Sequence, residues 1–114
     1  MSPAGWQDRL GALASEPVGP GLVLHVARSF GERRRGLARM APMPPDRGLH
    51  IVRTRSVHTF GMRFALDLVW IGRSGDVVRI DRDVPARRLR LCVGARSVVE
   101  VRAGQGDVFA HALD

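Results

Sequence analysis

The chain has 114 residues, 45% of them hydrophobic, which is enough for one core and too little for two. Its 18 basic residues outnumber its 11 acidic residues and give a formal net charge of +7 at pH 7; every basic residue is arginine, and asparagine and tyrosine are absent. A G+C-rich genome would produce the same bias, so the charge alone does not establish a polyanionic partner. The single cysteine, Cys92, excludes an intramolecular disulfide.

The N-terminal segment has the spacing of a short amphipathic helix. Trp6, Leu10 and Leu13 recur at i, i+4 and i+7, with Pro3 near the expected start and Pro17 just after the expected end. We therefore predict that residues 1–20 form an N-terminal helical arm and that residues 21–114 form a single β-rich domain.

The next elements are a strand and the best-defined helix start in the chain. Residues 22–27 form a compact β-type run, and Ser29 and Glu32 then have the spacing of a capping box, in which two side chains satisfy free backbone amides. The pattern predicts a helix from there to about Met40, where the proline-rich segment 41–45 ends it.

The remainder of the chain reads as β structure. Short apolar runs separated by turn-forming residues occupy positions 49–52, 57–60, 66–71, 77–80, 89–93, 98–101 and 108–111. The glycine-containing loop 72–76 predicts a hairpin, and residues 104–107 predict another turn. We expect a mainly β (α+β) fold: a small, barrel-like, strongly curled antiparallel or mixed sheet with one short helix packed on it.

Several of these segments, in this order, resemble a known family. They are Ala27-Arg-Ser-Phe-Gly-Glu-Arg-Arg-Arg-Gly-Leu-Ala-Arg39, Gly48-Leu49, Ala65-Leu-Asp-Leu-Val-Trp-Ile71, Gly75-Asp76-Val77, Pro85, Val99-Glu-Val101, Ala103-Gly104 and Gly106-Asp107. Over roughly residues 22 to 110 the chain resembles the uncharacterised DUF192 (UPF0127) family. The resemblance implies a compact, mostly β fold with a short helix, and no reaction. The chain departs from the family pattern at residues 57–62, where many members have an aromatic and basic segment, and at Ala65, which replaces a proline.

Asp67 is the most conspicuous polar residue, because it lies between Leu66 and Leu68 in an apolar strand. A carboxylate buried without partners costs several kcal/mol or takes up a proton, so arginine or backbone amides must satisfy it. Strand alternation turns Asp67 away from its two leucine neighbours, towards an outer face or a strand mouth. An ion pair with Arg63 or with an arginine of the predicted helix is the structural interpretation, and a binding or acid/base group is the functional one.

Glu100 poses the same question between Val99 and Val101. If it approached Asp67, the two carboxyl groups could support acid/base chemistry; a solvated glutamate opposite an arginine is the alternative. His58 is the histidine nearest these signature residues, and it could act as a base or remain a rim residue.

We hypothesise a non-enzymatic accessory module that binds an anionic small molecule or a protein partner. The expected ligand groove is lined by His58, Phe60, Arg63, Asp67 and Glu100. We assign no catalytic residues and leave enzymatic activity open. The enzymatic alternative is a small acid/base enzyme that uses Asp67 with Glu100 or His58.

The second alternative is a nucleic-acid binder that uses the two densest basic segments. Those segments contain Arg33, Arg34, Arg35, Arg87, Arg88 and Arg90. No recognised nucleic-acid motif accompanies them, so we favour a solvated face.

We expect no metal or other cofactor, because the remaining histidines, His25, His50 and His111, are scattered without metal-ligand spacing. No leader-like N-terminus and no apolar run of about 18 residues is present, so we expect a cytoplasmic protein without membrane insertion.

Overall fold

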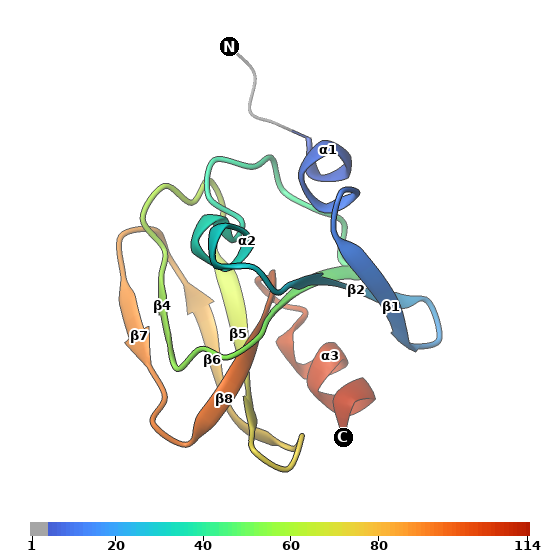
Figure 1. Ribbon diagram of the computed structural model, residues 1–114, viewed down its shortest axis with the longest axis vertical. Coiled ribbons are helices and arrows are strands. Elements are labelled where there is room, and N and C mark those ends of the chain that lie inside the picture. Colours follow the sequence, from blue (N-terminus) through green and yellow to red (C-terminus); the bar gives the residue numbers. More distant parts are fainter. Residues whose placement is uncertain (1–4) are drawn as a thin grey trace.

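The computed structural model describes residues 5–114 and shows a mainly β protein (Figure 1). In chain order the elements are α1 (Trp6–Leu10), β1 (Ala14–Gly19), β2 (Leu22–Ala27), α2 (Phe30–Arg35), β3 (Arg47–Ile51), β4 (Ser56–His58), β5 (Leu66–Gly72), β6 (Val77–Val84), β7 (Leu89–Leu91), β8 (Ala95–Arg102) and α3 (Gly106–Leu113).

The main sheet is mixed and open. Its six strands run in the order β1-β2-β3-β8-β5-β6, with β2 and β3 parallel and all other neighbours antiparallel. Strands β4 and β7 form a separate two-stranded antiparallel sheet. Because β1 and β6 remain as edges, the described residues contain no closed barrel, and the barrel-like part of the prediction is not confirmed.

The two faces of the main sheet carry separate hydrophobic clusters. On one face Leu68, Trp70 and Val98 pack with Leu10 and Leu37, which come from α1 and from the segment after α2. On the other face the neighbouring residues of the same strands, including Val69 and Val99, pack with Phe109 of α3. Alternation along β5 and β8 therefore builds two apolar layers, with α2 on one side of the sheet and α3 on the other.

Strands β5 and β8 are neighbours in the main sheet and are deeply buried. All seven residues of β5 are buried, and β8 is buried except at Arg96 and Arg102. The predicted hairpin after β5 is confirmed: the amide of Gly72 donates to the carbonyl of Asp76 at 2.8 Å.

The helix and strand predictions near the N-terminus are confirmed in part. The helix covers only Trp6–Leu10, and residues 14–19, expected to complete the helical arm, instead form edge strand β1 against β2. Pro17 is tolerated there because an edge strand need not donate every amide. Pro3, near the expected helix start, lies outside the described residues.

The helix predicted from Ser29 begins there but ends early. Its capping box is present, with Ser29 Oγ accepting from the Glu32 amide and Glu32 Oε1 accepting from the Ser29 amide, both at 3.1 Å. The helix stops at Arg35 rather than near Met40 because Gly36 takes a positive φ of 50°.

The strand predicted over residues 108–111 is wrong, because this segment belongs to helix α3. Gly106, Phe109, Ala110 and Leu113 recur at i, i+3, i+4 and i+7, and this stripe packs on the sheet. No helix within residues 5–114 has the length and apolar character needed to cross a bilayer.

Candidate functional site

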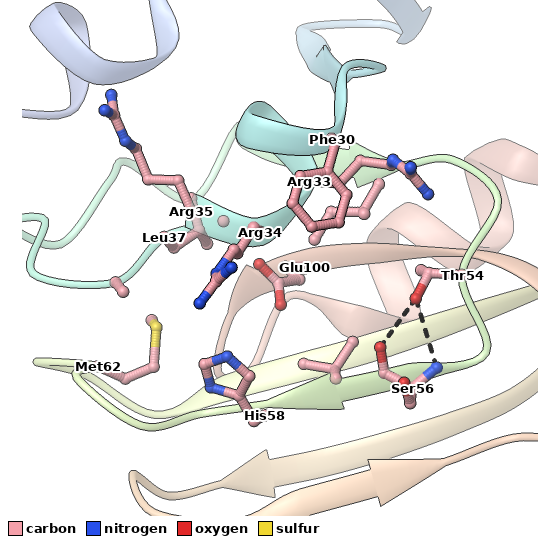
Figure 2. Close-up of a pocket in the computed structure, with 14 residues that line it drawn as sticks. Phe30, Arg33, Arg34, Arg35, Leu37, Thr54, Ser56, His58, Met62 and Glu100 are labelled. Carbon is pink, nitrogen blue, oxygen red and sulfur yellow. Dashed lines mark hydrogen bonds between the residues drawn. The ribbon is translucent and has the colours of Figure 1, made fainter.

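A pocket of about 250 Å³ opens between α2, β4 and the central strand β8 (Figure 2). Its apolar walls come from three parts of the chain: α2 and the segment after it, β3 to β4, and the loop that follows β4. These apolar residues are Phe30, Leu37, Ala38, Ile51, Val57 and Met62. Apolar walls with a few polar groups are typical of small-molecule sites.

The wall formed by α2 is fixed at both ends. At its start the capping box holds Glu32, and hydrogen bonds from the backbone amides of Ser29 and Arg28 lower the pKa of that carboxyl group. After its end, Arg9 of α1 donates from Nη1 to the carbonyl of Gly36 at 3.2 Å and from Nη2 to that of Ala38 at 2.8 Å. Burial, and then the charge of Arg35, lowers the pKa of Arg9.

Glu100 forms the floor of the pocket. It lies opposite Leu49 of β3 and Leu68 of β5 in the sheet register, and only 3% of its surface is exposed. Its Oε1 is buried without a hydrogen-bond partner, and Gly36 approaches it so closely that an added Cβ would lie 3.3 Å away. Burial raises the pKa of Glu100 to about 8, so this group is largely a neutral acid at pH 7.

Arg34 is the cation that faces this floor. Figure 2 shows its guanidinium reaching into the pocket between Glu100 and His58, whereas the side chain of Arg35 leads away. Arg33 also turns aside, since its Nη1 donates to the carbonyl of Arg53 at 3.1 Å. The pocket thus combines one inward guanidinium, one buried carboxyl group and apolar walls.

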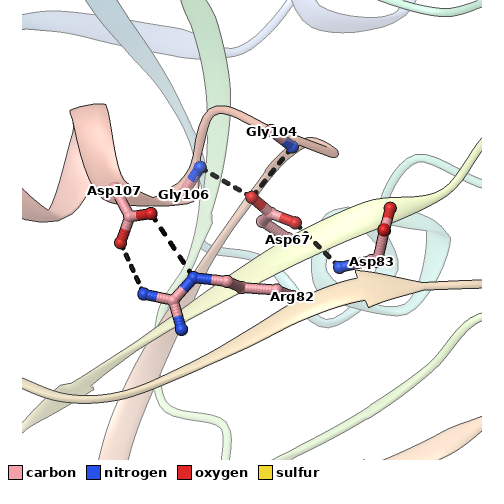
Figure 3. A network of polar contacts seen from close by, with 6 residues as sticks. All are labelled: Asp67, Arg82, Asp83, Gly104, Gly106 and Asp107. Carbon is pink, nitrogen blue, oxygen red and sulfur yellow. Dashed lines mark hydrogen bonds and ion pairs between the residues drawn. The ribbon is translucent and has the colours of Figure 1, made fainter.

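Asp67 lies on the opposite face of the sheet, against the start of α3 (Figure 3). Its Oδ1 accepts from the amide of Asp83 at 2.9 Å, and its Oδ2 accepts from the amides of Gly104 at 3.0 Å and Gly106 at 2.8 Å. An added Cβ on Gly106 would lie 2.8 Å from Oδ2, so only glycine allows this close approach. Asp67 of β5 therefore links the neighbouring strand β6 and the turn between β8 and α3.

Residues 15–110 match the model of the DUF192 family, which is described as "Uncharacterized ACR". This chain belongs to the DUF192 family. This match confirms the resemblance to DUF192 that the sequence indicated. The function of the family is unknown. No curated protein matches this DUF192 chain.

Two solved structures share the fold of this DUF192 protein. One is a protein of unknown function from Novosphingobium aromaticivorans, with a TM-score of 0.70, 17% identity, and coverage of 90% of this chain and 89% of that chain. The other is described as a "putative transcription regulator" from Sinorhizobium meliloti, with a TM-score of 0.68, 22% identity, and coverage of 76% of this chain and 73% of that chain.

The structure brings together only part of the groove expected from the sequence. His58 and Glu100 line the same pocket, and Phe60, 56% exposed, borders an adjoining shallow surface with its ring 5.8 Å from that of His58. Arg63 is exposed and is not among the residues that line the pocket, and Asp67 is on the other face. The expectation that Asp67 opens onto a concave, solvent-reachable surface is wrong, because it is 3% exposed and fully engaged by backbone amides.

The ion pair considered for Asp67 is also absent. Backbone amides hold its carboxylate, and the nearby Arg82 pairs instead with Asp107 (Figure 3). In the register of β5 and β8, Asp67 lies opposite Val101 whereas Glu100 lies opposite Leu68. The two carboxyl groups consequently point to opposite faces, so Asp67 pairs with neither Glu100 nor the pocket residue His58, and the predicted acid/base pairs are not formed.

The two basic segments occupy different places. Arg33, Arg34 and Arg35 line the pocket, whereas Arg87, Arg88 and Arg90 lie at β7 and just before it and do not line it. The sequence did not predict the apolar walls or the inward position of Arg34. The helix with the capping box and strand β8 are far apart in the chain, and no local pattern indicates that they lie together. Within residues 5–114 no three His, Cys, Asp or Glu side chains gather as metal ligands would.

Proposed function

We propose that this DUF192 protein is a binding module for a small organic anion, held in the pocket between α2 and β4. The observation that carries the proposal is Glu100, a carboxyl group that lines the pocket and has a buried oxygen without a hydrogen-bond partner. A buried polar group without a partner is costly, and a ligand that hydrogen-bonds to it offsets that cost.

Arg34 supplies the charge for this role. A guanidinium can hold a carboxylate or phosphate through two parallel hydrogen bonds, and this one is directed into the pocket (Figure 2). The apolar walls would cover a short hydrocarbon part of the ligand. A volume of about 250 Å³ favours a small molecule.

The test is calorimetric titration of the full chain with a panel of small carboxylates and phosphate esters at pH 7. Arg34→Gln removes the inward guanidinium, and Arg73→Gln, in the exposed turn between β5 and β6, removes the same charge elsewhere. We expect at least one compound to bind the wild type and Arg73→Gln equally and Arg34→Gln roughly tenfold more weakly. If both variants bound the compound equally weakly, the affinity would depend on the net positive charge of the protein, and binding in the pocket would be refuted.

Nucleic-acid binding is the second candidate, supported by three consecutive arginines on α2 beside the exposed ring of Phe30. The neighbour described as a "putative transcription regulator" is 22% identical and contributes only the likeness of fold. Replacing Arg33, Arg34 and Arg35 by glutamine should then abolish binding to RNA or DNA, and the wild-type affinity should fall steeply with salt. Absent or salt-insensitive binding removes this candidate.

A further inference from the structure

Among residues 5–114, Glu100 is the only carboxyl group that lines the pocket. The side chains opposite it on β3 and β5 are Leu49 and Leu68, which carry no charge. The charged and titratable groups that share the pocket with it are Arg33, Arg34 and Arg35 on α2 and His58 on β4. The floor therefore offers one carboxyl group beneath a basic rim.

The protonation state of that carboxyl group decides which ligand atom it can accommodate. Burial raises the pKa of Glu100 to about 8, so at pH 7 the group carries a hydroxyl that can donate a hydrogen bond. A ligand oxygen would accept that bond. A ligand ammonium group would require Glu100 to ionise, and the arginines on the rim repel an ammonium group.

We propose, on the basis of the proposed function, that the pocket selects small 2-oxo or 2-hydroxy carboxylic acids over amino acids with the same carbon skeleton. The carboxylate of the ligand pairs with Arg34, and the neighbouring carbonyl or hydroxyl oxygen accepts a hydrogen bond from Glu100. A short branched hydrocarbon chain packs against Leu37, Val57 and Met62. Glu100 is thus the specificity-determining residue.

The test uses three probes that differ only at the atom assigned to Glu100: 4-methyl-2-oxopentanoate, 2-hydroxy-4-methylpentanoate and leucine. Titration calorimetry at pH 7 should give affinities for the oxo and hydroxy acids about tenfold or more above that for leucine. Between pH 7 and pH 9 the wild-type affinity for the oxo acid, whose 2-oxygen can only accept, should fall about tenfold because Glu100 loses the proton that it donates.

The matched variant is Glu100→Gln, whose amide donates a hydrogen bond at every pH. It should keep the preference for the two acids and lose the dependence on pH. Glu100→Leu removes the donor and should weaken binding of the two acids to the level of leucine. If either variant fails to fold, the affinities of the wild type for the three probes at pH 7 and pH 9 still test the inference.

Leucine binding as tightly as the acids, or wild-type affinity for the oxo acid that does not change between pH 7 and pH 9, would overturn the inference. Binding of other small anions with none of these three probes would overturn it as well, while leaving the proposed function intact. If no small anion binds at all, the proposed function fails and this inference fails with it.

Discussion

Replacing Glu100 with glutamine isolates the cost of ionising a carboxyl group that the fold buries. The two side chains have nearly the same shape, but glutamine stays neutral at every pH. Burial raises the pKa of Glu100 from the ordinary 4.5 to about 8. Between these two values the folded protein holds a proton that the unfolded chain has released, so the free energy of unfolding falls as the pH rises from about 4.5 to 8.

The size of this effect follows from the same shift in pKa. Each unit corresponds to about 1.4 kcal/mol, so at pH 7 the wild type has lost about 3 kcal/mol that the glutamine variant retains. The difference in stability between variant and wild type should therefore grow by about 3 kcal/mol from pH 4 to pH 7. Burial also lowers the pKa values of His25 and His50, but these groups are present in both proteins and cancel in the difference.

Urea unfolding followed by tryptophan fluorescence at one-unit pH steps measures this difference. For a chain of this size the midpoint of the variant should move by at least about 1 M relative to the wild type between pH 4 and pH 7. Glu32→Gln is the matched control with the opposite sign, because hydrogen bonds lower the pKa of Glu32 and the wild type gains stability as that group ionises. A stability difference for Glu100→Gln that stays constant with pH would refute the reasoning.

Three further substitutions test how the sheet and the pocket wall are held. Asp67→Ala leaves three backbone amides without their acceptor and should lower the free energy of unfolding by about 3 kcal/mol or more, measured by urea unfolding; an effect below 1 kcal/mol would contradict this assignment. Gly106→Ala places a methyl group against Asp67 and should cost about 1–3 kcal/mol by the same assay, while ligand affinity of the folded protein stays unchanged because the pocket is on the other face. Arg9→Met removes the hydrogen bonds to Gly36 and Ala38 and should cost about 1–3 kcal/mol. The amides of residues 30–40 should then exchange hydrogen faster in that variant, and unchanged exchange would show that Arg9 does not fix this wall.

Elements defined by neighbours in the sequence could be predicted closely. The capping box of α2 depends on Ser29 and Glu32 only, and β5 was predicted to within one residue because an apolar run leads into a recognisable turn. The prediction of a strand at residues 108–111 was wrong because a short apolar run fits a strand as well as a helix. The wider stripe from Gly106 to Leu113 contains the helical period, and reading it over eight residues would have given the correct element.

The site depended on contacts between distant residues. The sequence indicated that Asp67 needs partners, and backbone amides were one of the two possibilities; the donors lie 16 to 39 residues away, so local pattern could not identify them. Strand pairing also determines the register of β5 and β8, in which Glu100 lies opposite the residue after Asp67 and not opposite Asp67 itself. That one-residue offset separates two carboxyl groups that the sequence presented as a possible pair.

Burial alone does not distinguish these two carboxyl groups, since each is 3% exposed. Their hydrogen bonds do: Asp67 accepts three from the backbone, whereas the buried oxygen of Glu100 has no partner. An acid that is already saturated by the fold has little capacity left for a ligand, and freeing it would undo the contact with α3. Glu100 can bind a ligand without breaking any hydrogen bond of its own, and for this reason we propose the binding role for the face that carries α2.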